Sequence, residues 1–272
     1  MESTINAKGS SVFVAGGTSG INLGIAEGFA QAGARVAVMS RDQAKVDHAV
    51  EKLRSLGCDA IGGAADVRDY EATTKVLEMV HAEFGDLDVV VSGAAGNFLA
   101  SAVGMSPKAF RAVVEIDLIG TYHVLRAAYP TLRKPGAVVI NISASQATMP
   151  MTFQSHACAA KAGIEMLTRV LALEWAHDGI RVNAVVPGPI AETEGMRRLA
   201  PTDEAREVVT RSVPLGRWGG VTDIARACIF LSSPQATYIT GAVLLVDGGW
   251  SLGGAHVAAS AIEALLGAPG ST

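Results

Sequence analysis

The chain has 272 residues, of which 49% are hydrophobic and 18% are charged, and its net charge at pH 7 is −4. That length accommodates one large α/β domain with a sizeable core. A slightly acidic chain has no general attraction for nucleic acid or for an anionic membrane surface, so we expect neither partner. The three cysteines, Cys58, Cys158 and Cys228, are widely separated and odd in number. Their spacing argues against a disulfide framework and against a zinc site, so no metal is expected.

The ends of the sequence carry no targeting pattern that we recognise. No basic-then-apolar leader precedes the first apolar run, and no apolar run approaches the roughly 20 residues that span a bilayer. The last five residues are Ala-Pro-Gly-Ser-Thr, which is not the peroxisomal S-K-L address. On these observations we expect a soluble, cytoplasmic protein.

Apolar runs of strand character alternate with longer helical patterns along most of the chain. The runs are continuous in Val, Ile, Leu and Ala, which is typical of parallel strands buried on both faces. The expected strands are 12–15, 35–39, 60–64, 87–91, 137–142, 181–186 and 243–246. The expected helices are 20–32, 43–56, 70–84, 110–132, 158–177 and 223–232. The alternation predicts a single doubly wound Rossmann-type α/β domain over 1–272, with a seven-stranded, mostly parallel sheet and helices on both faces.

Two segments depart from this alternation. Residues 187–204 are rich in Pro, Gly and charge and follow a strand, which predicts a mobile lid at the edge where such sheets bind ligands. The expected core covers about 10–250, so residues 251–272 form a C-terminal extension. Its Ala-rich part, 255–266, has the composition of a short helix.

The first strand runs into a glycine-rich turn, which is followed at once by helical periodicity. Gly16 permits the sharp turn, and Gly20 permits close approach of the backbone to a phosphate. A pyrophosphate would then face the N-terminus of the helix. The usual third glycine is replaced by Asn22, whose larger side chain is expected to crowd the helix start. A strand–turn–helix unit that binds no ligand has the same pattern. Whether this turn binds a dinucleotide must therefore be judged from the residues at the other strand ends.

Residues that suit a dinucleotide follow the next three strands. Arg41 stands near the position where NAD enzymes usually carry an acid, and a guanidinium there can grip a 2′-phosphate, which favours NADP(H). Asp42, one position later, suits a helix N-cap. Asp66 can accept a hydrogen bond from an adenine amino group. The small residues at 93–96 allow a flat ring and a ribose to lie on the backbone.

These features together resemble the short-chain dehydrogenase/reductase family over about residues 10–250. Further matching motifs are Asp117-Leu118-Ile119-Gly120, Lys161 at the start of a long helix, Pro187-Gly188 and Asp247-Gly248-Gly249. The resemblance implies NADP(H) as cofactor and a homotetramer. The cofactor contacts that it implies are Gly16, Thr18, Ser19, Gly20, Ile21, Arg41, Asp66, Val67, Ala94, Ala95, Gly96, Lys161, Pro187, Gly188, Ile190 and Thr193.

The chain lacks the proton donor that carbonyl-reducing members of this family use. Those members carry Y-x-x-x-K and a serine thirteen positions before the tyrosine. Counting back from Lys161, the two positions are Ala157 and Ala144. A methyl group cannot donate a proton to a carbonyl oxygen, so ordinary alcohol–ketone chemistry is disfavoured.

Several segments resemble the 2,4-dienoyl-CoA reductases, closest to the peroxisomal type: A-A-G-N-F-L, I-D-L-I-G-T, H-A-C-A-A-K-A-G and P-G-P-I-A-E-T-E-G-M-R-R-L. The resemblance implies an acyl-CoA thioester substrate, reduction of a conjugated C=C bond by NADPH, a 3-enoyl-CoA product, and Asp117 and Lys161 as the catalytic pair. Hydride addition to the far end of a dienoyl thioester creates an enolate, which needs a proton at carbon. A water ordered by an acid can deliver that proton, and donors must stabilise the oxygen.

Four further residues are candidates for substrate binding. Phe98 and Arg198 match positions of the dienoyl-CoA reductases, and Arg198 would meet the phosphates of coenzyme A. Ser143 and Ser145 lie near the site by position and suit donation to the thioester oxygen.

Two other functions remain open on the sequence. One is a carbonyl reductase or dehydrogenase of another substrate, with Asp117 or His156 as a substitute acid. The other is a dinucleotide-binding scaffold or redox sensor without catalysis, for which the missing tyrosine and serine and the presence of Asn22 would count. Acyl chain length, the physiological substrate and the role of residues 251–272 are not determined by the sequence.

Overall fold

The computed structural model describes residues 6–253, apart from the side chains of Arg198 and Leu199. Seven strands form one sheet in the order β3-β2-β1-β4-β5-β6-β7, and all six pairings are parallel. The strands are β1 (Ser11–Ala15), β2 (Arg35–Ser40), β3 (Ala60–Ala64), β4 (Val89–Ser92), β5 (Val138–Ile142), β6 (Arg181–Pro187) and β7 (Val243–Val246). The predicted fold class is confirmed.

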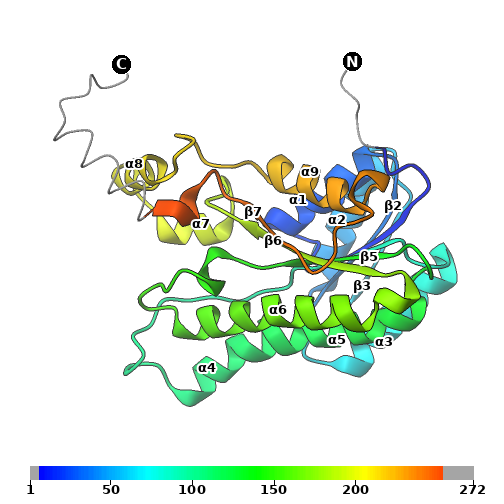
Figure 1. The fold of residues 1–272 in the computed structure, drawn as a ribbon, viewed down its shortest axis with the longest axis horizontal. Helices are drawn as coiled ribbons and strands as arrows, with labels where there is room; N and C mark the ends of the chain where they lie inside the picture. Colours follow the sequence, from blue (N-terminus) through cyan, green and yellow to red (C-terminus); the bar gives the residue numbers. More distant parts are fainter. Residues whose placement is uncertain (1–5, 254–272) are drawn as a thin grey trace.

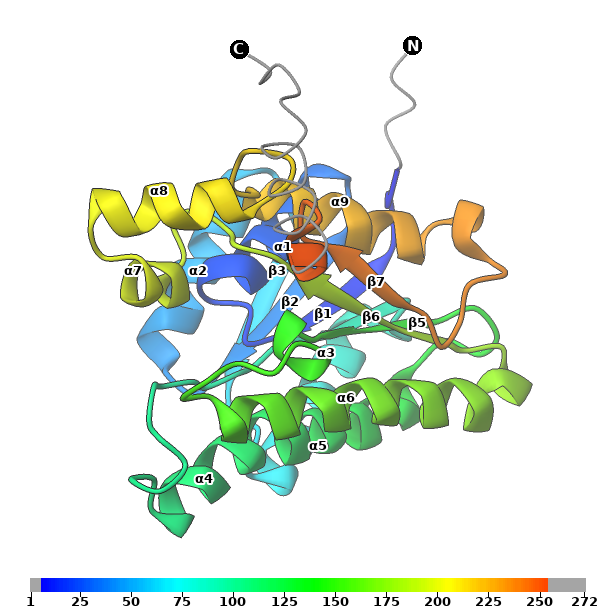
Figure 2. The same cartoon turned by 60° about the vertical axis from the view of Figure 1, so that its left-hand side comes forward.

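Helices cover both faces of the sheet (Figure 1, Figure 2). On one face lie α1 (Gly20–Gln31), α2 (Gln43–Ser55) and α9 (Val221–Ser232), and on the other lie α3 (Tyr70–Phe84), α5 (Gly120–Ala128) and α6 (Ser155–Glu174). Strand side chains alternate between the two cores: Val12 and Val14 pack in the first, Phe13 and Ala15 in the second. Both faces of each strand therefore need apolar residues, which explains the continuous apolar runs.

The segments that leave the carboxyl ends of the strands meet at one edge of the sheet, because all the strands are parallel. The strand order reverses between β1 and β4. There the Gly93 N–H donates to the Ala15 carbonyl at 3.2 Å, and on the other side of β1 the Gly16 N–H donates to the Met39 carbonyl at 2.8 Å. Chain from β1 then enters α1 on one face, while chain from β4 leads to helices on the other. This divergence opens the crevice in which such sheets bind ligands.

The long helix expected over 110–132 is interrupted. It consists of α4 (Pro107–Val114), a π-helical turn η1 (Glu115–Ile119), α5, and a 3₁₀ turn η2 (Tyr129–Thr131). π-Helical turns are rare and frequently occur at functional sites. Asp117 lies in this turn and its side chain is buried.

The expected lid over 187–204 is partly helical. It contains α7 (Glu194–Leu199), and a helix that was not expected, α8 (Asp203–Ser212), follows it. Two indoles fix the C-terminal end of α8: Trp218 Nε1 donates to Thr210 Oγ1 at 2.8 Å, and Trp250 Nε1 donates to Ser212 Oγ at 3.0 Å. The helix proposed over 255–266 lies outside the described residues.

Candidate active site

The glycine turn after β1 presents an open helix N-terminus. Ser19, the N-cap of α1, has extended backbone and makes no side-chain capping bond, and the first turn holds no acidic residue. Gly20 has φ +54°, and a Cβ built on it would meet nothing within 4 Å. The first N–H groups of α1 are therefore free to bind an anion, and the helix dipole favours one. This arrangement fits a pyrophosphate and brings the predicted contacts Thr18, Ser19, Gly20 and Ile21 together.

Asn22 connects this turn to the turn after β4. Its Nδ2 donates to the Gly93 carbonyl at 2.7 Å. A Cβ on Gly93 would lie 2.1 Å from Asn22 Oδ1, and a Cβ on Gly16 would lie 2.9 Å from Ala94 Cα. The amide thus occupies the space that a side chain at position 93 would need. Asn22 supports the contact between the two turns instead of crowding the helix start.

The adenosine end of the crevice carries two guanidinium groups. Asp66 is held by Arg68, whose Nη2 and Nε lie 2.6 and 3.0 Å from the two carboxylate oxygens. These bonds, with a smaller contribution from the charge of Arg41, hold the pKa of Asp66 below its ordinary value. Asp42 caps α2 as predicted, with its Oδ1 accepting from Lys45 N. Arg68, which the sequence reasoning missed, could have been found from its place two residues after Asp66.

Asp117 and Lys161 form a buried ion pair. The Lys161 Nζ lies 3.5 Å from Asp117 Oδ2, and their side chains are 9% and 2% exposed, respectively. Asp117 Oδ1 accepts from the Gly96 N–H at 2.8 Å, and Lys161 Nζ donates to the Ile142 carbonyl at 3.1 Å. The two predicted catalytic residues are therefore together. The predicted Ala94-Ala95-Gly96 turn is bonded directly to the carboxylate.

Ala157, at the position of the missing tyrosine, lies one turn before Lys161 on α6. Ala144, at the position of the missing serine, follows Ile142, whose carbonyl accepts from Lys161, by two residues and is flanked by two serines. Ser143 Oγ donates to the buried Glu165 carboxylate at 3.1 Å, so its one hydroxyl hydrogen is directed into α6. Ser145 Oγ is buried and has no hydrogen-bond partner among the residues that the structure describes. In this arrangement Ser145, and not Ser143, retains a free donor.

His156 is fully buried one position before Ala157, and the Phe98 ring packs on it at 4.4 Å between centroids. Neither ring nitrogen makes a hydrogen bond of acceptable geometry, although the carbonyls of Gln154 and Phe98 lie close enough to favour the protonated form. Burial lowers the pKa of His156 below its ordinary value, and the nearby Asp117 charge opposes that shift only in part. A largely neutral imidazole at neutral pH argues against His156 as a substitute acid.

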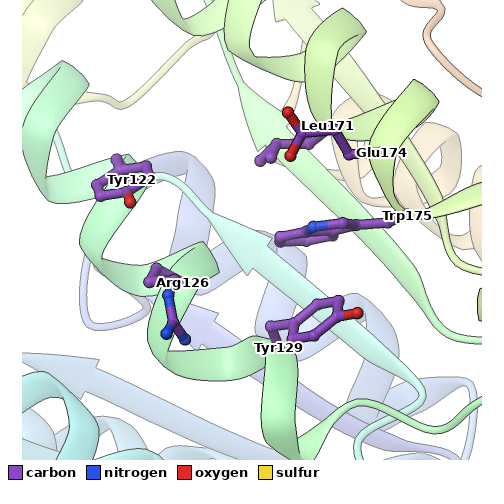
Figure 3. Close-up of a pocket in the computed structure, with 6 residues that line it drawn as sticks. All are labelled: Tyr122, Arg126, Tyr129, Leu171, Glu174 and Trp175. Atoms are coloured by element: carbon purple, nitrogen blue, oxygen red, sulfur yellow. The ribbon is translucent and has the colours of Figure 1, made fainter.

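Each of the four tyrosines has other surroundings. Tyr70 packs on His123, Tyr122 is 47% exposed on α5, Tyr129 donates to Asp178, and Tyr238 is fully exposed. Tyr122 and Tyr129 line a hollow between α5 and α6 (Figure 3). Over residues 6–253, no hydrogen bond joins a tyrosine hydroxyl to Asp117 or Lys161, so no phenol takes the missing donor's place.

The residues predicted after β6 begin the lid. Pro187 ends the strand, and the Gly188 N–H donates to the Val246 carbonyl at 3.1 Å. Ile190 is buried. Thr193 caps α7 with its hydroxyl oxygen, which accepts from the Met196 N–H at 3.4 Å, and the same hydroxyl donates to the Ile190 carbonyl at 2.9 Å. The side chain of Arg198 lies outside the described part of the chain, so its predicted role in substrate binding stays a prediction, as do the roles of the predicted cofactor contacts.

Residues 6–253 hold no group of three or more His, Cys, Asp or Glu placed to bind a metal ion. Within the same range, no helix combines the length and the apolar character that crossing a bilayer requires.

The model of one protein family, described as Enoyl-(Acyl carrier protein) reductase, matches residues 15–251. A short-chain dehydrogenase from Bacillus anthracis is 33% identical, with a TM-score of 0.79 over 90% of this chain and 97% of that one. The chain belongs to the short-chain dehydrogenase/reductase family. The crystal structure of gox2181 gives a TM-score of 0.85 at 30% identity, over 91% and 98% of the two chains. The predicted enzyme class, an oxidoreductase that uses a nicotinamide dinucleotide, is confirmed.

Among its relatives, this short-chain dehydrogenase/reductase is 40% identical to proteins named peroxisomal 2,4-dienoyl-CoA reductase, (3E)-enoyl-CoA-producing. The Arabidopsis thaliana protein matches over 95% of this chain and 90% of its own, and the Rattus norvegicus protein over 87% and 82%. A Bacillus subtilis protein, 35% identical over 88% and 95%, is named "Probable 2,4-dienoyl-CoA reductase", (2E)-enoyl-CoA-producing.

The expectation of a cytoplasmic protein is contradicted by these relatives, whose names place them in the peroxisome. The expectation rested on a missing terminal address. Such an address is a short segment read by a receptor, and it leaves no mark on composition or fold. The lack of one recognised address was therefore insufficient to predict a cytoplasmic location.

The contact between Asn22 and Gly93 predicts non-additive effects on stability. Asn22→Ala leaves the Gly93 carbonyl without its partner and is expected to cost about 1–2 kcal/mol. Gly93→Ala places a methyl group on the amide and is expected to cost more. The double variant should lose at least about 1 kcal/mol less than the sum, because the methyl group then enters vacated space. Urea unfolding measures all three; additive losses would contradict the coupling.

The two guanidinium groups predict different cofactor selectivity. Arg41→Ala is expected to weaken NADPH binding about 10–100-fold and NADH binding little, because a charge-assisted pair with the 2′-phosphate is lost. Arg68→Ala, which acts through Asp66, is expected to weaken both cofactors by similar factors. Fluorescence titration gives the four dissociation constants. Equal losses of NADPH and NADH in Arg41→Ala would refute its role at the 2′-phosphate.

Proposed function

We propose that this chain is an NADPH-dependent reductase that acts on a CH–CH group, converting a 2,4-dienoyl-CoA to a 3-enoyl-CoA. The observation that carries the proposal is the buried Asp117–Lys161 pair at 3.5 Å, in a chain that has alanines at both positions of the usual hydroxyl donors. The relatives named 2,4-dienoyl-CoA reductase support the reaction class.

The chain's own residues suit a reaction that ends with a proton on carbon. When bound, the reduced nicotinamide supplies a hydride to C5 of the dienoyl thioester. The π electrons of C4=C5 then shift to C3–C4, those of C2=C3 shift to C1–C2, and the carbonyl electrons shift to the C1 oxygen. The result is a dienolate. Ser145 carries a buried hydroxyl without a partner, and in this proposal it donates to that oxygen.

The proton comes from a water that Asp117 and Lys161 orient, and the hydroxide that remains takes up a proton from the solvent. Asp117 cannot rotate freely, because one oxygen accepts from Gly96 and the other faces Lys161. Protonation of the enolate at C2 leaves the double bond between C3 and C4, which gives a 3-enoyl-CoA. Protonation at C4 would give a 2-enoyl-CoA, as in the name of the Bacillus subtilis relative. The position of the water relative to the dienolate decides between them.

NADPH is proposed as the cofactor because Arg41 follows β2 and no acid precedes it there. An actinorhodin polyketide ketoreductase whose crystal structure contains NADPH is 28% identical to this chain, with a TM-score of 0.84 over 89% of this chain and 97% of that one, which supports a nicotinamide cofactor carrying the 2′-phosphate.

The outer face of α5 and α6 is proposed to pair with a second copy, as one contact of a homotetramer. A hollow of about 340 Å³ between these helices is lined by Tyr122, Arg126, Tyr129, Leu171, Glu174 and Trp175 (Figure 3). Leu173, on α6, is 83% exposed. Arg126 and Glu174 take part in no ion pair within residues 6–253. A two-fold axis would set Arg126 of each copy against Glu174 of the other.

Substitution of the catalytic carboxylate tests the mechanism. Asp117→Asn keeps an acceptor for the Gly96 N–H but removes the charge. It is expected to bind NADPH within about twofold of wild type and to lower kcat by about 10²–10⁴-fold. Glu165→Gln is the matched control, a buried carboxylate on α6 bonded to Ser143, and is expected to change kcat by less than about threefold. Unchanged turnover in Asp117→Asn would remove Asp117 from the mechanism.

The reaction itself is tested by NADPH absorbance with a 2,4-dienoyl-CoA in D₂O. We expect NADPH to be consumed and a 3-enoyl-CoA with one deuterium at C2 to form. NMR of the product locates both the deuterium and the double bond. Deuterium at C4 would assign the other product. Turnover with ketones alone would favour a carbonyl reductase, and NADPH binding without any turnover would favour the scaffold or sensor.

The charges of Arg126 and Glu174 on the α5–α6 face predict that one substitution will dissociate the oligomer and that a second will restore it. Arg126→Glu sets like charges against each other and is expected to shift the particle to a lower mass in light scattering. The charge-reversed double variant Arg126→Glu/Glu174→Arg should restore the wild-type mass. A wild-type protein that is a monomer at all concentrations tested would contradict the interface.

A further inference from the structure

Phe153 combines two features that folding does not explain. Its backbone has φ +65°, a left-handed conformation that is uncommon for a bulky residue, and its side chain is 58% exposed. A strained backbone persists only where the surroundings hold it, and such strain gathers at functional sites. An exposed aromatic ring gains little from burial in the protein's own core. Both features call for something outside the folded chain.

The strained conformation is held by hydrogen bonds between two loops. The Ala100 N–H donates to the Phe153 carbonyl at 3.0 Å. The buried Gln154 accepts on Oε1 from Asn97 Nδ2 at 2.7 Å and from Gln146 Nε2 at 3.1 Å. The loop after β4 and the loop before α6 are thereby joined, and the backbone of Phe153 is held at this junction.

These loops are continuous with the candidate catalytic pair. Asp117 accepts from Gly96, the residue directly before Asn97. Three exposed apolar side chains lie on these two loops. Phe98 and Leu99 follow Asn97 in the loop after β4, and Phe153 lies in the loop before α6; they are 38%, 60% and 58% exposed. We name these three residues the rim. Phe98 also contacts His156, on the turn of α6 that precedes Lys161.

We propose that the rim is the contact surface for the hydrocarbon chain of the acyl-CoA, and that Phe153 sets the preference for chain length. This rests on the proposed function. An acyl thioester has a polar reacting end and an apolar tail, and the site has a buried charged pair with an exposed apolar rim beside it. Large exposed apolar groups gathered in one place mark a binding surface. The substrate class is a 2,4-dienoyl-CoA with several methylene groups beyond C5.

The test is a chain-length series of 2,4-dienoyl-CoA substrates with six, eight, ten and twelve carbons. For wild type, kcat/KM is expected to rise by up to about fourfold for each methylene that the rim buries. In Phe153→Gly the rise should largely vanish, with at least tenfold loss at ten carbons and little change at six. Phe153→Leu, which keeps an apolar side chain, should retain most of the rise. Tyr238→Ala, which removes a fully exposed ring elsewhere, should leave the series unchanged.

Loss of folding is distinguished by the melting temperature. Glycine accepts the left-handed backbone without strain, so Phe153→Gly should melt at or above the wild-type temperature. A lower melting temperature would overturn the assignment of strain. An unaltered chain-length series in Phe153→Gly would overturn the rim while leaving the proposed function intact.

Failure of the proposed function gives a different result, because wild type would then reduce none of the four substrates. Binding of the unreactive hexanoyl-CoA and decanoyl-CoA, measured by calorimetry with NADP⁺ present, separates the two cases. Tighter binding of decanoyl-CoA by wild type and not by Phe153→Gly supports the rim even without reduction. Equal binding of the two acyl-CoAs by wild type would overturn it.

Discussion

The arrangement of the site depends on one buried ion pair. Taking a carboxylate and an ammonium out of water is costly unless each is paired and hydrogen-bonded. Asp117 and Lys161 meet that condition through the Gly96 N–H and the Ile142 carbonyl. The four groups come from η1, α6, the turn after β4 and the end of β5. Misplacing any one of these elements would leave a buried charge without its partner, so the pair ties the position of the turn to that of the helix.

The turn after β4 is shared by the two halves of the site. At one end, the Gly93 carbonyl accepts from Asn22 on α1, which links it to the glycine turn. At the other end, Gly96 bonds to the carboxylate, and the following residues carry the rim. A short stretch of small residues therefore relates the dinucleotide turn, the candidate proton source and the apolar surface to one another. Bulky residues would not permit these close approaches, as the 2.1 Å between a Cβ at position 93 and Asn22 Oδ1 illustrates.

The replacement of hydroxyl donors by alanine changes which atom of a substrate the site can protonate. A phenol and a serine hydroxyl suit a carbonyl oxygen, whereas Ala157 and Ala144 offer no proton. What remains is the Asp117–Lys161 pair, together with the hydroxyl of Ser145, which has no hydrogen-bond partner within residues 6–253. Burial lowers the pKa of His156, so at neutral pH its imidazole carries less positive charge than a free one would. These features agree with chemistry at carbon, in which the proton comes through water.

The strand order and most of the helices could be predicted from the residues alone, because burial on two faces imposes a recognisable pattern. The residues at the strand ends could be predicted too, because parallel strands share one edge. The sequence also indicated the pairing of Asp117 with Lys161, through the motifs they belong to. The π-helical turn escaped it, since one wide turn hardly alters the apolar period, and so did α8, which buries no residue. The fold was needed to show that Ser143 turns to Glu165 and that Asn22 fits against Gly93, because these contacts join residues 22 and 71 positions apart. Those choices depend on which side chains the fold brings within hydrogen-bond distance, and short-range patterns contain no record of that.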